Sequence, residues 1–199
     1  NYLYQFAVMG SAYAQKMMGI EKPRVGLVNI GAEKEKGNEL AKEAFALLET
    51  ADINFTGNAE ARDIPSGVVD VAVCDGFVGN VILKYTEGLA SSLMDIIKEA
   101  LTTSGFKAKL GAMLSKPAYR KIKKKFDYAE VGGAPFLGLN ALVIKAHGSS
   151  NAKAIAGALG QVVAFAQSDA SAALKYAAQK FIEKGQPEPE TEPDKNREE

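Results

Sequence analysis

The sequence has few of the residues that build disulfides, metal sites or membrane spans. It contains one cysteine, Cys74, one histidine, His147, and no tryptophan. A single cysteine excludes a disulfide within the chain, and no apolar run approaches the roughly 20 residues that cross a bilayer. Nothing resembles a secretion signal, so we expect a cytoplasmic protein.

Charge of one sign is not in excess either. The formal net charge is zero, which gives no overall reason to expect nucleic acid as a partner. Asp70 and Asp75 are expected on different sides of one strand, and no cluster of histidine, cysteine and carboxylate has ligand spacing, so no metal site is predicted. Cys74 ends an apolar run, where a thiol is usually inert packing rather than a covalent acyl carrier.

Strand-like and helix-like segments alternate along the chain. With 199 residues and 47% hydrophobic content, the chain is long enough for one α/β domain with a substantial core. The alternation predicts βαβ units and a largely parallel sheet. Residues 57–63 are expected to form a polar loop. The expected strands are 24–30, 53–55, 68–74 and one entered at 142; the expected helices are 2–18, about 38–48, about 80–100 and about 151–182.

Three turns follow predicted strands, after Ile30, Cys74 and Ile144. Ligands of parallel sheets gather at the carboxyl ends of the strands. The segments 75–80 and 147–150 each combine glycine with polar residues ahead of a helix, a layout whose backbone N–H groups suit a phosphate dianion. Turn formation and helix capping, by Ser149 and Ser150 for the last helix, explain the same residues without a ligand.

Individual side chains in these turns have two interpretations each. His147 follows a strand and precedes Gly-Ser-Ser, which favours a functional role over a purely structural one. Lys84, one turn into the long helix, fits either an anion contact or a solvated surface position.

The segment from about 105 to 127 is strongly basic. No acidic residue occurs between 107 and 125, and Pro117 is expected to divide the stretch into two short amphipathic helices that form a hairpin. A solvated helix pair, a subunit contact and a membrane-surface element are all consistent with the pattern, and the last two, which are compatible, are favoured. The eight basic residues are Lys107, Lys109, Lys116, Arg120, Lys121, Lys123, Lys124 and Lys125.

Both ends of the sequence carry an expectation. The chain starts at Asn1, inside a predicted helix, so we expect a further N-terminal portion. Residues 1–184 are expected to form the folded part, and the Pro- and Glu-rich residues 185–199 a disordered acidic tail.

Several motifs, in order over residues 1–178, resemble the PlsX phosphate acyltransferase family. Their order makes the resemblance more specific than any one of them. The motifs are Val-Gly-Leu-Val-Asn-Ile-Gly at 25–31, Lys-Gly-Asn-Glu at 36–39, Gly-Asn-Ala-Glu-Ala-Arg-Asp at 57–63, Asp-Gly-Phe-Val-Gly-Asn at 75–80, Lys-Phe-Asp-Tyr at 125–128 with Gly-Gly at 132–133, and Lys-Ala-His-Gly-Ser-Ser at 145–150.

The resemblance implies a three-layer α/β/α fold with a mostly parallel sheet, akin to phosphotransacetylases and isocitrate/isopropylmalate dehydrogenases. It implies a homodimer that associates peripherally with the membrane. The family moves a long fatty acyl group from acyl carrier protein to inorganic phosphate. The acyl-phosphate passes to a membrane glycerol-3-phosphate acyltransferase for phospholipid synthesis. Family members carry a further N-terminal α/β portion whose glycine-rich turns are expected to line the same cleft.

For this reaction phosphate attacks the thioester carbonyl directly, which requires neither cofactor nor metal. The enzyme must bind a dianion and stabilise charge on oxygen and sulfur. His147 is expected either to protonate the departing thiolate or to donate a hydrogen bond to the oxyanion. The candidate catalytic residues are His147, Lys145 and Asn80; the candidate phosphate- or substrate-binding residues are Gly76, Gly79, Lys84, Gly148, Ser149 and Ser150, with Asn29, Asn38 and Asn58 as secondary candidates.

The basic segment has two candidate partners under this interpretation. Its lysines suit anionic lipid, with apolar side chains inserting, and they equally suit the acidic surface of acyl carrier protein. The candidate contact residues are Leu110, Met113, Leu114, Lys121, Lys123, Lys124 and Lys125.

Other functions compete with this one. A short-chain phosphotransacetylase acting on acyl-CoA would share the fold but would not need a lipid-facing element. A decarboxylating dehydrogenase is disfavoured because no convincing carboxylate set for a divalent metal occurs. A non-catalytic module that binds membrane or carrier protein is the alternative from a different class.

Overall fold

The apolar run after Pro23 forms the central strand of a three-stranded sheet. In the computed structural model, which describes residues 1–125 and 132–183, β1 (Val25–Asn29) lies between β2 (Phe55–Glu60) and β3 (Val71–Val73). Both pairings are parallel. The chain is thus α/β with a parallel sheet flanked by helices, which confirms the predicted fold class and is consistent with a three-layer arrangement.

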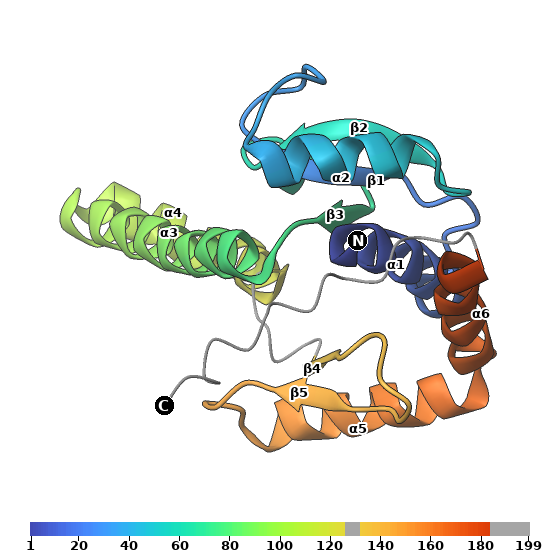
Figure 1. Cartoon of the computed structure of the whole chain (residues 1–199). Coiled ribbons are helices and arrows are strands. Elements are labelled where there is room, and N and C mark those ends of the chain that lie inside the picture. Colours follow the sequence, from blue (N-terminus) through green and yellow to red (C-terminus); the bar gives the residue numbers. More distant parts are fainter. Residues whose placement is uncertain (126–131, 184–199) are drawn as a thin grey trace, which may run out of the picture.

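Two helices contribute to the same core on this sheet. α1 (Tyr2–Met18) contacts β3, and α2 (Glu39–Glu49) contacts β2 and β1 (Figure 1). Because side chains alternate along a strand, Val25 and Leu27 point to one face of β1, and both are buried. The cluster comprises Leu3, Tyr4, Ala7, Val25, Leu27, Ala44, Phe45, Leu48 and Val73.

The second strand is longer than the sequence predicts. Residues 57–60, expected in a loop, belong to β2. The register shifts by one residue between the pairs Val25–Phe55 and Leu27–Asn58, and Gly57 has φ 92° there. A bulge at a glycine lets the strand continue through polar residues, a feature that hydrophobicity patterns do not reveal.

The strand before His147 does not join this sheet. β5 (Ile144–Ala146) pairs in antiparallel fashion with β4 (Gly133–Pro135), and α5 (Ala152–Gln167) packs on both. β5 therefore lies outside the parallel sheet, in a separate two-stranded antiparallel sheet. The short Gly-Ala-Pro strand that pairs with it carries no apolar alternation, so hydrophobicity patterns do not indicate this strand pair.

The predicted helix over 151–182 is two helices. α5 ends at Gln167 and α6 (Ala170–Glu183) begins after an extended Ser168. The Ser168 hydroxyl accepts the Ala170 N–H and donates to the Phe165 carbonyl, which stabilises the break. As a result α6 turns back and packs along α1 (Figure 1).

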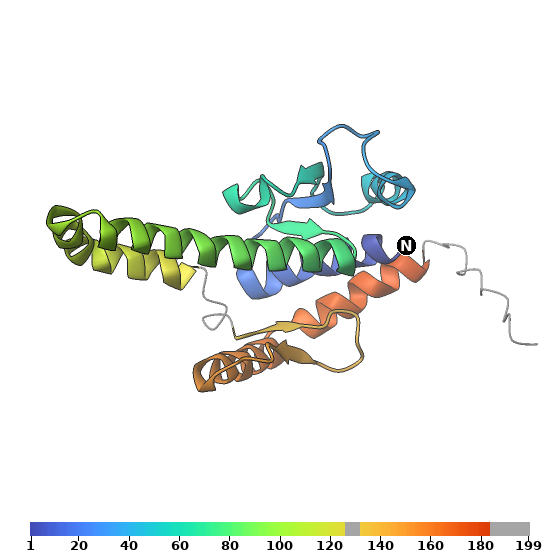
Figure 2. The same ribbon diagram turned by 90° about the vertical axis from the view of Figure 1, so that its left-hand side faces the viewer.

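A helical arm projects from the sheet. α3 (Gly76–Thr103) and α4 (Phe106–Lys125) pack against each other and extend away from the rest of the chain (Figures 1 and 2). α3 contains no buried residue. Within residues 1–125 and 132–183, no helix has both the length and the apolar content needed to cross a membrane.

The hairpin is formed differently from the prediction. Pro117 lies inside the single helix α4 and does not divide it, so the two antiparallel helices are α3 and α4. A proline removes one amide donor, and the strong helix formers around Pro117 carry the helix past it. The short 3-10 helix Ile64–Ser66 precedes β3, and residues 185–199 of the expected tail lie outside the described residues.

Candidate functional site

Two asparagine side chains, Asn29 at the carboxyl end of β1 and Asn58 within β2, meet beside the loop that follows β1. Asn29 is buried, and its Nδ2 donates to Asn58 Oδ1 at 3.1 Å and to the Lys36 carbonyl at 2.9 Å. Its Oδ1 accepts the Ile30 N–H at 2.8 Å. Asn58 Nδ2 donates to the Glu33 carbonyl at 2.7 Å. The pair therefore fixes the loop of residues 30–38 at this edge of the sheet.

The loop closes tightly on Asn29 at Gly37. Gly37 has φ 96°, and a Cβ there would lie 2.5 Å from Asn29 Oδ1 and 2.9 Å from the Ala41 Cβ. Asn38 follows as the N-cap of α2, its Oδ1 accepting the Ala41 N–H at 2.9 Å. The three asparagines predicted as secondary substrate contacts thus all hold the local backbone.

The turn after β3 is capped by a carboxylate. Asp75 Oδ1 accepts the N–H groups of Phe77 and Val78 at 2.8 and 2.9 Å. Gly76 and Gly79 lie in the first turn of α3, and the Gly79 N–H donates to the Asp75 carbonyl. Two of the amides expected to serve phosphate are thus already accepted by Asp75.

The Cys74 thiol lies beside this cap and is partly buried. Burial, and secondarily the negative charge of Asp75, raises the pKa of Cys74. A Cβ on Gly79 would lie 3.0 Å from the Cys74 sulfur, so the first turn of α3 packs directly on it. Both observations agree with an inert, packed cysteine.

Two further candidates lie on α3 beyond the cap. Asn80 is exposed on the first turn. Lys84 is exposed too, and its Nζ lies 3.0 Å from Glu87 Oε2 in an i,i+3 ion pair. An anion at Lys84 would compete with Glu87 for the ammonium group.

The third group of candidates follows β5. His147 and Ser149 lie in one turn, with His147 Nδ1 2.7 Å from Ser149 Oγ. The Ser149 backbone N–H also donates to Nδ1, at 3.2 Å, and the Ser150 N–H donates to the His147 carbonyl at 3.0 Å. The Ser149 hydroxyl and the Ser149 N–H therefore both contact the same ring nitrogen, Nδ1.

Lys145 and Ser150, which flank this turn, differ in how exposed they are to solvent. Lys145 is exposed on β5, where it pairs with Ala134. Ser150 Oγ is enclosed and makes no hydrogen bond to the part of the chain that the structure describes. The cap of α5 is Asn151, whose Oδ1 accepts the Ala154 N–H at 3.0 Å, so the expectation that Ser149 or Ser150 caps this helix is wrong.

The candidates form three groups, one at each strand end. Asn29 and Asn58 lie on β1 and β2 with Asn38 at the start of α2, Gly76, Gly79 and Asn80 lie at the start of α3, and Lys145 to Ser150 lie on β5 and in the turn after it. The hydrogen bonds described above lie within each group: Asn29 to Asn58, the amides of Phe77 and Val78 to Asp75, and Ser149 to His147. The described residues also contain no cluster of three or more metal-ligating side chains.

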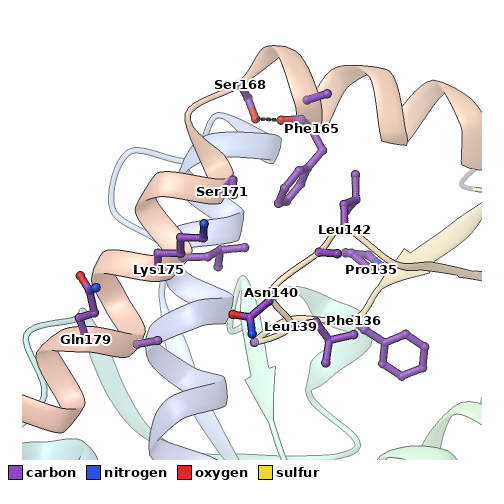
Figure 3. A pocket seen from close by; sticks show the side chains of 15 residues that line it. Pro135, Phe136, Leu139, Asn140, Leu142, Phe165, Ser168, Ser171, Lys175 and Gln179 are labelled. Carbon is purple, nitrogen blue, oxygen red and sulfur yellow. Dashed lines mark hydrogen bonds between the residues drawn. The ribbon is translucent and has the colours of Figure 1, made fainter.

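A cavity lies at the other end of β5. Its volume is about 450 Å³, and the β4–β5 loop and α6 line it, the loop through Asn140 and Leu142 and α6 through Lys175 and Gln179 (Figure 3). Leu142 precedes β5 whereas His147 follows it. None of the candidate catalytic or phosphate-binding residues lines the cavity.

The arm presents both apolar and basic side chains. Leu110, Met113 and Leu114 are spaced to share one face of α4, and they are 45%, 64% and 73% exposed. Lys121 is exposed as well, whereas the side chains of residues 123–125 lie outside the described ones. On α3, the apolar Leu89, Leu93 and Ile96 are more than half exposed.

Sequence reasoning missed several of these contacts. It did not identify Asp75 as the cap of α3, Asn151 as the cap of α5, or Gly37 as a point of close backbone approach. The caps had a signal, because aspartate and asparagine are preferred directly before a helix. The contact between Gly37 and Asn29 had none, since it depends on the folded loop.

Comparisons with known proteins give a consistent result. The sequence profile of the family described as "Fatty acid synthesis protein" matches residues 1–173. A phosphate acyltransferase of Brevibacillus brevis is 53% identical over 178 residues, which cover 89% of this chain and 53% of that relative. One of Thermoanaerobacter pseudethanolicus is 58% identical over 167 residues, 84% of this chain and 50% of the relative. The chain spans about half the length of these curated relatives.

Proposed function

Because this chain belongs to the fatty acid synthesis protein family, we propose that it supplies part of the active site of a phosphate acyltransferase. The enzyme transfers a long-chain fatty acyl group from acyl-acyl carrier protein to inorganic phosphate and forms acyl-phosphate for phospholipid synthesis. The observation that carries the proposal is the identity of 53% to relatives named phosphate acyltransferase, sustained over 89% of the chain.

The chemistry is a direct displacement. A phosphate oxygen attacks the thioester carbonyl carbon, a tetrahedral oxyanion forms, and the C–S bond then breaks to release the carrier's thiolate. The acyl group ends on phosphate, so no redox step is needed. Stabilisation of the oxyanion and of the phosphate dianion is the task of the protein.

The polar groups at the strand ends supply suitable donors. Asn80, Lys145, His147, Ser149 and Ser150 are proposed to contact phosphate or the oxyanion. Lys145 supports this proposal because its side chain is exposed and can reach a bound anion. Ser150 supports it because its hydroxyl makes no hydrogen bond to the described residues and can still donate one. Gly76, Gly79, Lys84 and Gly148 are proposed as further phosphate contacts. Because the candidates lie at the ends of strands in two different sheets, and the chain spans about half the length of its relatives, the remaining half of the protein is proposed to complete the cleft.

The arm is proposed to serve the hand-off of product. Acyl-phosphate is an amphiphile, and a membrane glycerol-3-phosphate acyltransferase would consume it. The exposed Leu110, Met113 and Leu114 beside basic residues support peripheral attachment of a cytoplasmic enzyme to the membrane. The exposed face of α3 supports a subunit contact in a homodimer. Acyl carrier protein, which is acidic, is the alternative partner of the lysines.

Acyl-phosphate formation from palmitoyl-acyl carrier protein by the full-length protein tests the proposal. We expect phosphate-dependent turnover, and we expect His147→Ala to reduce it. Turnover of acetyl-CoA in its place would assign a short-chain phosphotransacetylase. No turnover of either substrate, with flotation on anionic liposomes retained, would assign a non-catalytic membrane-binding module.

A further inference from the structure

The hydrogen bonds in the His147 turn fix which ring nitrogen carries the proton. A backbone N–H is always a donor, so the Ser149 N–H, 3.2 Å from His147 Nδ1, needs a lone pair on that nitrogen. The Ser149 hydroxyl, 2.7 Å from the same atom, is then also a donor to it. In the neutral ring the proton must therefore be on Nε2.

We propose that Ser149 is a positioning residue that holds His147 as the Nε2–H tautomer, so that the ring acts as a hydrogen-bond donor to the oxyanion or to phosphate. The tautomer follows from the geometry of the turn alone, whereas its use in catalysis rests on the proposed function. Because the single hydroxyl proton of Ser149 is donated to the ring, it cannot also be donated to phosphate, so Ser149 acts through His147 in place of the direct phosphate contact considered above.

The tautomer decides between the two roles considered for His147. If the neutral Nε2–H ring gave its proton to the departing thiolate, an imidazolate anion would remain, because Nδ1 carries no proton to keep the ring neutral. A hydrogen bond from Nε2–H to the oxyanion requires no such transfer and strengthens as negative charge develops on oxygen. His147 is thus an electrostatic donor in the displacement step, and the carrier's sulfur leaves as the thiolate.

Long-range ¹H–¹⁵N spectra of the full-length protein labelled at histidine read the tautomer directly. A His147→Gln variant identifies the resonances of this ring by their loss. At a pH where the ring is neutral, we expect Nε2 to appear as the protonated nitrogen and Nδ1 as the unprotonated one. A protonated Nδ1 in the wild-type protein would overturn the assignment, whatever the activity.

Ser149→Ala and Ser149→Thr separate positioning from a structural effect. Ser149→Ala keeps the backbone donor but loses the hydroxyl, so we expect the preference for the Nε2–H form to fall by roughly fivefold, the effect of one ordinary hydrogen bond. We expect kcat to fall by about tenfold with little change in KM. Ser149→Thr retains the hydroxyl and should restore both the spectrum and kcat.

The outcomes distinguish this inference from the proposed function. An unchanged ring spectrum in Ser149→Ala, together with lost turnover, would overturn the positioning role. A changed spectrum with wild-type kcat would overturn the use of the tautomer in catalysis. If the wild-type protein formed no acyl-phosphate at all, the proposed function would fail while the tautomer assignment would still be decided by the spectrum.

Discussion

Asn29 and Asn58 face each other across the first two parallel strands, and the Asn29 amide nitrogen donates to the Asn58 amide oxygen at 3.1 Å. Each side chain also donates to a carbonyl of the same loop, Asn29 to Lys36 and Asn58 to Glu33. The loop is thus held from two strands by one connected set of hydrogen bonds, and such a set is expected to act as a unit.

Removing either amide should reveal that coupling. Asn29→Ala should lower the free energy of unfolding by about 2–3 kcal/mol, because a buried side chain that makes three hydrogen bonds is lost. Asn58→Ala, at a half-buried position, should cost about 1 kcal/mol. In urea unfolding, the double variant should cost less than the sum of the single changes. Strictly additive losses would show that the two amides act independently.

Gly37 should tolerate no side chain. Gly37→Ala places a Cβ against the Asn29 amide and imposes φ 96° on an L-residue, so we expect a loss of at least about 2 kcal/mol. Gly19→Ala is the matched control. Gly19 also has a positive φ, 70°, but no atom lies within 4 Å of the added Cβ, so the cost should be about 1 kcal/mol. Equal losses in thermal unfolding would contradict the steric argument.

The negative charge of Asp75 should affect the pKa and the reactivity of the Cys74 thiol. Asp75→Asn keeps a good helix cap but removes the negative charge, which is the second cause of the raised pKa of Cys74 after burial. The pKa of Cys74 should fall, and iodoacetamide should modify the thiol faster at a given alkaline pH. The gain should be modest, because burial persists. Cys74→Ser identifies the signal, and a slower reaction in Asp75→Asn would contradict the electrostatic effect.

Acid sensitivity should arise in part from one ion pair. Hydrogen bonds from the Arg24 side chain and N–H lower the pKa of Asp70 from 3.8 to about 2. A lowered folded-state pKa stabilises the fold above the ordinary value, and that contribution is lost as pH falls through about 2. Asp70→Asn should therefore flatten the fall in stability between pH 4 and pH 2, and Arg24→Gln, which removes the side-chain donors but keeps the backbone N–H donor, should flatten it in part. A wild-type slope in both variants would refute this origin.

The lysines of the arm should govern attachment to anionic membranes. In the full-length protein, we expect Lys107→Glu, Lys109→Glu, Lys116→Glu and Lys121→Glu together to abolish flotation on anionic vesicles, since each lysine near such a surface contributes about 1 kcal/mol. Lys16→Glu with Lys22→Glu, on α1 and its following loop, is the control. If the combined variant floats normally but its KM for acyl-acyl carrier protein rises and loses its dependence on salt, the lysines contact the carrier protein.

The sequence predicted the first half of the fold well and the second half less well. The run at 24–30 is mostly apolar, and its Val25 and Leu27 belong to the core cluster that residues of α1 and α2 complete; such runs indicate a buried strand directly. For β5, the apolar run predicted a strand but did not indicate which strand it pairs with. It pairs with a three-residue Gly-Ala-Pro strand, so its separation from the first sheet depends on tertiary contacts that periodicity does not encode.

The candidate site shows the same limit. Glycines and polar residues at strand ends were found from their positions, but the partners of Asn29, Asp75 and His147 are set by the folded turns. The separation of the β5 turn from the ends of β1 and β3 could not be predicted either, because β5 belongs to a different sheet. Residue type and position identified the candidate residues, and only the structure showed which of them are hydrogen-bonded to each other.

The helix α3 has a consequence for the dynamics of the chain. At 28 residues it is about 42 Å long, yet no residue in it is buried. Its amides are therefore protected by helical hydrogen bonds and by α4 rather than by the sheet, which places the arm at the low end of local opening free energies. Amide hydrogen exchange should be faster in α3 than in β1. Any surface that covers the arm in the assembled enzyme should slow the exchange of the α3 amides.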